Sequence, residues 1–435
     1  MDDLTCEKCN KDFKTEKTFE KHKNRKTPCK TVKVIKTNQK ETKHTEPMKF
    51  IDLFCGIGGF HTALKNLGFS CLMACDIDKY CREVYLNNYG IEPAPDVKKI
   101  DPNKLEDFDI LCAGFPCQAF SNAGKKKTFE DDRGLLFDEI IRIVKVKKPK
   151  FLFLENVKHI LKVGDGEVIK YIRQKLDDSN YHLQLFEMSP HNYGIPQQRE
   201  RIYFVCIRKD IYQDKDVELI HPKIDSIDFK SFLDKKEDIP EKYFIKGDIL
   251  DCLNAWEEMI PVFEVEEKIS PTIMVNEFNS EYTDEEFNAL AKWKQDYITK
   301  NKPLYEKYKD QWDTWYEKHK SILTKREIYG KLEWQVGKIK PNDSIFNYFI
   351  QIRQSGIRVK KREYFPTLVA ISQIPIYGGE KRYITPKECL RLQSFPDNFK
   401  LLEGDRHSYK QLGNCVNVNN VNNVIESTLK MYGYL

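Results

Sequence analysis

The chain lacks any long apolar run. Its 435 residues contain no stretch of about 18 apolar residues, and no apolar segment follows the basic N-terminal end. We therefore expect neither a membrane-spanning helix nor a secretion signal. The length exceeds that of one ordinary hydrophobic core and predicts two or three structural units.

Cysteines are too sparse for a small disulfide framework. The 13 cysteines are scattered through apolar and loop contexts instead of forming a dense pattern. This usage favours a reducing compartment, which means the cytoplasm if the source is prokaryotic and the nucleus if it is eukaryotic. Secretion is excluded on the same ground.

Net charge is also small, at +5, but it is unevenly distributed. Residues 1–50 hold 14 Lys and Arg against 8 Asp and Glu, a balance of +6 that leaves the rest of the chain at about −1. Such a basic end suits a polyanionic partner such as nucleic acid. We interpret residues 33–47, which are mostly polar, as a linker.

The basic end also carries candidate zinc ligands. Their spacing begins like that of a ββα zinc finger, with two residues between the first cysteines and twelve before the histidine. Phe13 and Phe19 lie where such a finger keeps its small core. We predict a zinc-finger-like module at residues 1–32 with a Cys3His site, although a disordered lysine-rich arm with incidental cysteines is the alternative. The predicted ligands are Cys6, Cys9, His22 and Cys29.

A candidate nucleophile follows the apolar run at residues 110–113. Cys117 stands in the sequence Gly-Phe-Pro-Cys-Gln, where the end of a strand would present it in a loop. A thiolate attacks carbon well when its pKa is lowered by nearby cations or a helix N-terminus. An isolated Pro-Cys is more often a buried structural cysteine. The companion motifs favour the catalytic interpretation here.

Upstream, the pattern predicts a nucleoside pocket. An apolar strand at residues 49–54 leads into a glycine-rich turn, and a second apolar strand ends at Asp76. An acid about 20 residues after the glycines is placed to bind ribose hydroxyls. Ile77 is free to cover an adenine face, and Asp96 could accept a hydrogen bond from the adenine amino group.

Downstream, an acid and two arginines complete the set. Glu155 directly follows the apolar residues 151–154, at the predicted carboxyl end of a strand. Arg199 and Arg201 alternate on an extended segment and should point the same way. Two guanidinium groups on one face suit a phosphate or the carbonyl of a base. The alternatives are a surface glutamate and a solvated strand face.

Together these motifs resemble the DNA (cytosine-5)-methyltransferase family, over residues 48–210 and 364–425 and in the family's order. Three residues depart from its pattern: Asp76 replaces Glu, Pro95 replaces Gly and Cys415 replaces Ser. The matching segments are residues 52–60, 76–78, 96–97, 114–118, 155–157, 197–201, 391–396 and 411–416.

The resemblance implies a reaction. Cys117 would add to carbon 6 of a flipped-out cytosine, and carbon 5 would take a methyl group from S-adenosylmethionine. Glu155 would hold or protonate ring nitrogen 3, Arg201 would hold the exocyclic oxygen, and Arg199 would help hold the phosphate and the Cys117 loop. Gln118 and Ser121 would contact DNA. The implied cofactor contacts are Phe54, Gly56, Gly58, Gly59, Asp76, Ile77, Asp96, Pro116, Asn414 and Val416.

The resemblance also implies the fold and domain order. We expect an α/β doubly wound, seven-stranded, mostly parallel sheet built from residues 48–210 and 405–435. A smaller target-recognition domain would occupy residues 211–404. In it, Arg353 or Arg358 beside Gly356 would read bases, with positioning of a phosphate as the equal alternative. Residues 283–300 and 303–325 are predicted helices, with Pro303 at a first helical position and an aromatic stripe that packs instead of stacking on bases.

The predicted function is methylation of cytosine in a specific double-stranded DNA sequence by a monomer, as in restriction-modification systems, with a cognate endonuclease as a possible partner. Two alternatives are a cytosine-5 methyltransferase acting on transfer RNA and a non-catalytic DNA-binding protein with a similar core. The long insert and the finger favour DNA. The intact set of Cys117, Glu155, Arg199 and Arg201 favours catalysis.

Overall fold

The chain falls into two units, Met1–Glu46 and Pro47–Leu435. The computed structural model describes residues 15–24, 47–116, 135–224, 226–269, 272–278, 282–370 and 373–435. In the first unit these include helix α1 (Glu16–Lys23), where Phe19 is buried. No helix in the described ranges is both long enough and apolar enough to cross a membrane.

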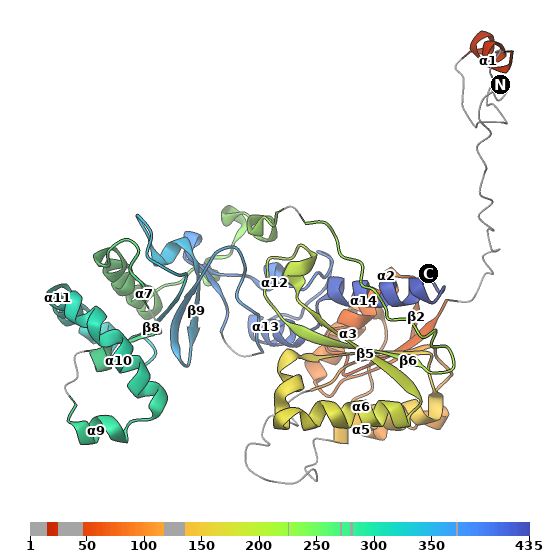
Figure 1. The fold of residues 1–435 in the computed structure, drawn as a ribbon, viewed down its shortest axis with the longest axis horizontal. Helices are drawn as coiled ribbons and strands as arrows, with labels where there is room; N and C mark the ends of the chain where they lie inside the picture. The colour runs from red at the N-terminus through yellow and green to blue at the C-terminus, as the bar shows by residue number, and fades with distance from the viewer. Residues whose placement is uncertain are drawn as a thin grey trace. The chain divides into compact units, whose positions relative to one another are not determined.

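The larger unit contains a six-stranded sheet with the order β2-β1-β3-β4-β6-β5 (Figure 1). Neighbours from β2 to β4 are parallel, whereas β6 is antiparallel to both β4 and β5. The expected count of seven strands is therefore not met within the described residues, where the sheet has six. Its strands are β1 (Lys49–Leu53), β2 (Ser70–Cys75), β3 (Ile110–Gly114), β4 (Phe151–Val157), β5 (Tyr181–Met188) and β6 (Arg201–Arg208).

The strand order predicts a ligand-binding crevice at one edge of this sheet. The chain runs outward from β1 to β2 and then returns to β3 on the other side of β1. In open α/β sheets, ligands bind outside the carboxyl ends of the strands at such a reversal. The glycine turn after β1 and the loop after β3 both lie at this edge, so the topology supports the predicted position of the site.

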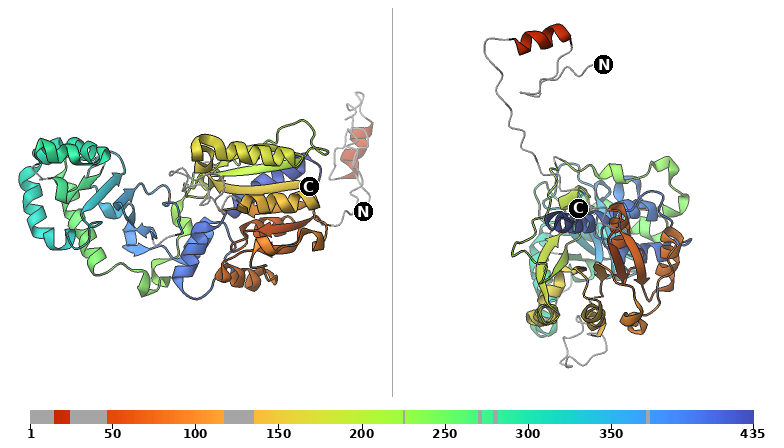
Figure 2. Two further views of the ribbon diagram at one scale, coloured as in Figure 1. Left: turned by 90° about the horizontal axis from the view of Figure 1, so that it is seen from below. Right: turned by 90° about the vertical axis from the view of Figure 1, so that its right-hand side faces the viewer.

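Helices cover both faces of the sheet (Figure 2). Strand side chains alternate, so Phe50 joins the buried cluster that includes α2 and α14, whereas Ile51 joins the one that includes α5 and α6. Because α14 is the last helix of the chain, both ends of the larger unit build one core. The helices are α2 (Gly59–Asn66), α3 (Lys79–Tyr89), α5 (Leu135–Lys147), α6 (Glu167–Asp178) and α14 (Val418–Met431).

A second sheet has its own core. Its six strands follow the order β12-β11-β9-β10-β8-β7, and all neighbouring pairs are antiparallel except β8 and β10. Domain boundaries at 211 and 404 remain a prediction. The strands are β7 (Ile273–Met274), β8 (Lys331–Gln335), β9 (Phe349–Arg353), β10 (Gly356–Lys360), β11 (Ile376–Tyr377) and β12 (Arg382–Tyr383).

The helices beside this sheet contain the aromatic stripe. Trp312 and Trp315 are buried against Trp256, which confirms their packing role. The predicted position of Pro303 was wrong, because this residue lies inside a helix instead of at its start. The helices are α7 (Asp248–Met259), α8 (Val275–Phe278), α9 (Asp284–Ala289), α10 (Lys292–Lys307) and α11 (Lys309–Leu323).

Two further helices return the chain to the first core. Helix α12 (Pro386–Leu392) contributes Cys389 and Leu392 to the cluster shared with α14, and α13 (Asp405–Asn414) follows it. Short 3-10 helices occupy Val97–Lys99, Pro102–Lys104, Lys158–Gly166, Pro190–Tyr193, Phe229–Phe232, Lys236–Asp238, Glu241–Tyr243, Ile260–Val262, Ile345–Asn347 and Gly378–Glu380.

Candidate active site

The glycine turn between β1 and α2 adopts a conformation that suits close approach of a ligand. Gly58 has φ of 90°, and a Cβ on it would collide with the Tyr89 ring. A Cβ on Gly59 would lie 2.6 Å from Val416 Cγ2. Phe54 also has a positive φ, of 53°, at the end of the strand. The turn therefore brings Val416, near the C-terminus, against the start of α2.

Asp76 closes this turn from the side of β2. Its Oδ2 accepts a hydrogen bond from the Gly56 amide at 2.8 Å, and its Oδ1 accepts one from the Asp78 amide at 2.8 Å. Burial raises the pKa of the Asp76 carboxyl, and these two amide donors oppose that rise. The shorter side chain of aspartate is thus held firmly at the crevice.

Two residues predicted to surround an adenine, Ile77 and Asp96, differ in their exposure and contacts. The Ile77 side chain is 83% exposed, an unusual state for isoleucine and one that leaves it available to cover a ring. Asp96 caps a short helix by accepting from the Lys98 amide at 3.0 Å. Pro116 and Asn414 are exposed.

Glu155 and Arg201 form the centre of the predicted catalytic set. Arg201 Nε lies 2.9 Å from Glu155 Oε1. Glu155 is only 7% exposed, and burial raises its pKa while Arg201 and, less strongly, Arg199 lower it. A carboxyl group in this setting can retain a proton at a higher pH than ordinary glutamate, as proton donation to a base requires.

The strand carrying Glu155 is longer than expected. β4 continues through Val157, so Glu155 lies within the strand and not directly after it. Asn156, to which the sequence assigned no role, donates its Nδ2 to the Phe115 carbonyl at 2.9 Å. A side-chain amide within a buried strand needs hydrogen-bond partners, and this need was the signal in the sequence that could have identified Asn156. Asn156 thus fixes the main chain two residues before Cys117.

Arg199 is buried, whereas the resemblance predicted that it would help hold a phosphate and the Cys117 loop. It is 2% exposed, so this side chain cannot reach a surface phosphate in the conformation observed. Its guanidinium donates to three main-chain carbonyls, and burial lowers its pKa to about 10. Those carbonyls belong to Leu368 at 2.6 Å, Gly413 at 2.8 Å and Cys415 at 2.9 Å.

Three of the residues assigned to catalysis and DNA contact, Cys117, Gln118 and Ser121, lie outside the described residues. Their roles therefore remain predictions. The structure brings Glu155, Arg201 and Arg199 together, and it brings the glycine turn together with Asp76 and Val416.

Comparison with known proteins identifies the family. Residues 48–430 match the model of the C-5 cytosine-specific DNA methylases. The chain is 30% identical over 372 residues to the Type II methyltransferase M.HhaI of Haemophilus parahaemolyticus, covering 86% of this chain and 91% of that protein. It is 31% identical over 403 residues to M1.ScrFI of Lactococcus lactis subsp. cremoris, covering 90% and 80%.

The chain belongs to the C-5 cytosine-specific DNA methylases. It methylates carbon 5 of cytosine in DNA, and dependence on S-adenosylmethionine is expected for the family. The alternatives of transfer RNA methylation and of binding without catalysis are therefore not supported.

Solved structures agree with the α/β methyltransferase fold. The methyltransferase EhMeth of Entamoeba histolytica has a TM-score of 0.52 at 19% identity, covering 89% of this chain and 99% of that one. Dnmt2 of S. pombe has a TM-score of 0.51 at 17% identity, covering 88% and 99%. At these identities the likeness concerns the fold alone.

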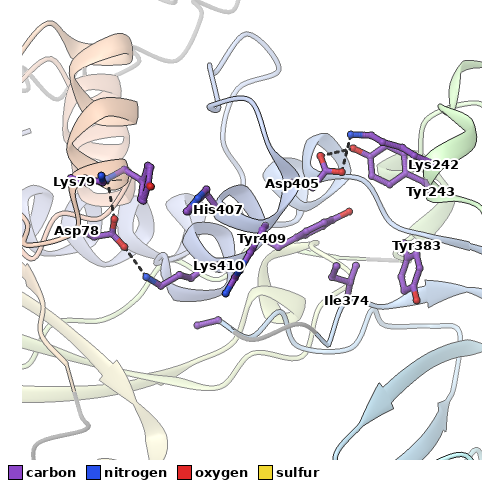
Figure 3. A pocket seen from close by; sticks show the side chains of 13 residues that line it. Asp78, Lys79, Lys242, Tyr243, Ile374, Tyr383, Asp405, His407, Tyr409 and Lys410 are labelled. Carbon is purple, nitrogen blue, oxygen red and sulfur yellow. Dashed lines mark hydrogen bonds and ion pairs between the residues drawn. The ribbon is translucent and has the colours of Figure 1, made fainter. Parts of the chain in front are cut away.

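In this methylase, a cavity of about 760 Å³ adjoins residues 76–78, which form the acidic loop after β2 (Figure 3). Lys410 of α13 points toward Asp78 at the start of α3 and forms an ion pair at 2.8 Å. On the other side, Lys242 and Tyr243 both point toward Asp405, at 2.8 and 2.9 Å. The Asp78–Lys410 pair therefore links the acidic loop to the helix that leads to Asn414 and Val416.

The two arginines predicted to read DNA bases have different surroundings. They lie on an antiparallel hairpin in which Gly356 faces Arg353 and has φ of 126°. Arg358 Nε forms an ion pair with Glu333 Oε2 at 2.7 Å across neighbouring strands. Arg353 Nε is buried without a hydrogen-bond partner, and burial and Arg358 lower its pKa.

The predicted zinc site cannot be described as a whole. His22 lies on α1, whereas Cys6, Cys9 and Cys29 lie outside the described residues. Within the described ranges, no cluster of three or more histidine, cysteine or acidic side chains could hold a metal ion.

Proposed function

We propose that this methylase acts through a covalent adduct between Cys117 and cytosine, with Glu155 and Arg201 activating the base. The supporting observation is the buried Glu155–Arg201 pair, next to the Asn156 contact that fixes the chain before Cys117. A paired acid and cation at the carboxyl edge of the sheet match the needs of a ring that gains negative charge on addition.

The steps follow from the chemistry of the base. The Cys117 thiolate adds to carbon 6, and the electron pair of the 5,6 double bond makes carbon 5 nucleophilic. Glu155 holds or protonates nitrogen 3, while Arg201 holds the exocyclic oxygen. After methyl transfer the carbon 5 proton leaves, and elimination of the thiolate restores the ring. The base must leave the duplex for these contacts to form.

The residues of the crevice fit S-adenosylmethionine. When bound, this cofactor supplies an electrophilic methyl group. The glycine turn at Gly56, Gly58 and Gly59 would let main chain approach the cofactor closely, and a Cβ on Gly56 would meet no protein atom within 4 Å, which leaves open space at this residue. Asp76 would hold the ribose hydroxyls and Ile77 would cover the adenine. The remaining contacts would come from Phe54, Asp96, Pro116, Asn414 and Val416.

For DNA recognition, the hairpin of β9 and β10 favours Arg353 as the residue that reads a base. Glu333 already engages Arg358, whereas the Nε of Arg353 has no hydrogen-bond partner. A guanidinium fork next to glycine suits the O6 and N7 acceptors of guanine. Arg358 and Glu333 would then hold the hairpin, and Gln118 and Ser121 would contact the DNA near the flipped base.

The N-terminal unit would be a zinc-finger-like module that strengthens DNA binding through phosphate contacts. The spacing of Cys6, Cys9, His22 and Cys29 and the burial of Phe19 on α1 support this proposal. A monomer within a restriction-modification system, with a cognate endonuclease as partner, completes the proposed biology.

The experiment that tests the mechanism uses duplex DNA with 5-fluorocytosine at the target and S-adenosylmethionine. Because fluorine at carbon 5 cannot leave as a proton does, we expect an adduct that resists denaturation. Cys117→Ser should form no adduct and show no turnover. The matched control is Cys112→Ser, on the buried strand before the loop, which should retain the adduct. Full turnover by Cys117→Ser would refute the mechanism.

A further inference from the structure

Helix α3 contacts the main chain of the acidic loop with its first turns. Arg82 Nη1 donates to the carbonyls of Asp76 and Ile77, each at 2.9 Å. Asp78 caps the same helix by accepting from the Tyr80 amide at 3.0 Å. The two carbonyl contacts fix the peptide planes on either side of Ile77. They hold the exposed isoleucine and the Asp76 carboxyl in one relative orientation.

The last residue of the same helix contacts the glycine turn. The Tyr89 hydroxyl donates to the Gly58 carbonyl at 2.8 Å and lies 2.7 Å from the Thr62 hydroxyl. Its ring fills the space where a Cβ on Gly58 would lie, and it stacks on His61 with ring centroids 3.8 Å apart. The Tyr89 ring therefore holds the turn at the conformation that only glycine adopts freely.

Arg82 and Tyr89 are seven residues apart, which is about two helical turns and places them on one face of α3. Each contacts main-chain carbonyls of a different loop of the crevice. Because both loops leave the carboxyl ends of neighbouring strands, one helix thus spans them. An arrangement of this kind lowers the ordering cost that a flexible loop adds to ligand binding.

We propose that α3 is a brace for the cofactor site, and that Arg82 and Tyr89 are positioning residues that preset both loops for S-adenosylmethionine. This inference rests on the proposed function, which assigns the cofactor to these loops. Neither side chain takes part in the chemistry. Their effect is confined to cofactor affinity, and the rate of methyl transfer at saturating cofactor is independent of them.

The test measures the Kd of S-adenosylmethionine for full-length protein by titration calorimetry, together with kcat at saturating cofactor and DNA. Arg82→Gln and Tyr89→Phe should each raise the Kd about 5- to 10-fold, as expected for losing one or two hydrogen bonds, and leave kcat within about twofold. Arg82→Lys should recover part of the affinity.

Two controls lie on the same helix. Glu83→Gln removes an exposed charge next to Arg82. Tyr85→Phe removes a buried hydroxyl that contacts His61 at 2.6 Å and not the glycine turn. Both should leave the Kd within about twofold. Equal losses in the controls and the test variants would overturn the proposal, because the effect would then belong to the helix as a whole.

Asp76→Ala separates failure of the brace from failure of the site assignment. If Asp76→Ala weakens cofactor binding strongly while Arg82→Gln and Tyr89→Phe do not, the brace is refuted and the site stands. If Asp76→Ala leaves the Kd unchanged, the assignment of the cofactor to these loops is refuted. If Tyr89→Phe fails to fold, the partly exposed Arg82 decides, and an unchanged Kd in Arg82→Gln refutes the brace.

Discussion

Glu155 and Arg201 form a buried ion pair at the candidate active site. Burial raises the pKa of Glu155, and the Arg201 guanidinium at 2.9 Å opposes that rise. Glu155 can consequently donate a proton in its protonated form or accept a hydrogen bond in its ionised form. Such opposing influences on one carboxyl group are typical of acid–base residues in enzymes.

Glu155→Gln should lower kcat by about 10²- to 10⁴-fold, because an amide can contact nitrogen 3 but cannot transfer a proton to it. DNA affinity should stay within about twofold, since the glutamine has the same shape. Single-turnover methylation and DNA titration by fluorescence anisotropy measure the two effects. Loss of DNA binding with normal turnover would instead make Glu155 a structural residue.

Arg201→Gln should shift the pH profile of methylation. Removing this cation takes away the strongest influence that lowers the Glu155 pKa, so that pKa rises further. If the protonated acid is required, the rate falls as pH rises through its pKa, and the descending limb should therefore move to higher pH in the variant. Single-turnover rates across pH measure the shift, together with a loss of about 10²-fold in rate. An unmoved limb would show that Glu155 does not titrate in the profile.

Among the elements, the segment before β6 links distant parts of the chain. Arg199 donates to carbonyls of Leu368, Gly413 and Cys415, all far away in sequence. Two of these carbonyls, those of Gly413 and Cys415, flank Asn414, which is a predicted cofactor contact. Arg199 thus holds the segments that contain Leu368, Gly413 and Cys415 against the segment before β6.

Arg199→Ala should lower the free energy of unfolding by about 3 kcal/mol, because three carbonyls lose their buried charged donor. Urea unfolding followed by circular dichroism measures this change. The control is Arg208→Ala at the far end of β6, where the guanidinium pairs with the exposed Asp210 and donates to one main-chain carbonyl, that of Lys148, so the expected loss is about 1 kcal/mol. Equal losses would mean that the three carbonyl contacts add nothing.

The β9–β10 hairpin gives a comparison of two arginines. Arg353→Ala should cost about 1–3 kcal/mol of discrimination at one base pair and relax the sequence preference there. Arg358→Ala should weaken binding to all sequences alike, since it loosens the hairpin through Glu333. Methylation of a library of variant sites, followed by bisulfite sequencing, separates these outcomes. A relaxed position in Arg358→Ala alone would reverse the assignment.

Some features of the helices and strands were predictable from the sequence and others were not. The strands with apolar runs, the glycine turn and the acid after β2 were predictable from local pattern, because strand burial and turn chemistry are local properties. The end of β4 was not, since Glu155 and Asn156 are tolerated in a buried strand only through their distant partners Arg201 and Phe115. Pro303 remains inside α10, where buried Leu304 packs in the second core and overrides the local preference.

The candidate site was predictable to the extent that motifs carry chemistry. The motifs singled out Glu155, Arg201 and Asp76, whose roles at the site remain predictions. The roles of Arg82, Tyr89 and Arg199 could not be predicted from the sequence, because each depends on main-chain carbonyls that only the fold brings near. Main-chain contacts leave little trace in residue type.

For the whole molecule, the main division is between Met1–Glu46 and Pro47–Leu435. Every matched residue of the family model lies in the second unit. The excess positive charge lies in the first unit, and we propose that this charge contributes to DNA affinity.

Deleting residues 1–46 should leave cofactor binding and the modified sequence unchanged. DNA affinity should fall and its salt dependence should flatten, because lysines that contact phosphates are lost. Affinity measured across salt concentrations tests this, and metal analysis should find about one zinc in the full chain and none in the shortened one. Zinc retained after deletion would refute the ligand assignment, and a changed target sequence would show that the first unit reads bases.

The packing of α14 on α2 has a consequence for biosynthesis. Ribosomes release the N-terminal part of a chain first, and domains generally fold as units during synthesis. Here Val421, Val424 and Ile425 of the last helix complete the core that α2 begins, and Val416 completes the glycine turn. The nascent chain therefore exposes an unfinished core until α14 has been synthesised. A product that stops before Val416 lacks α14 and the side chain that packs against Gly59, so both its core and its glycine turn are incomplete.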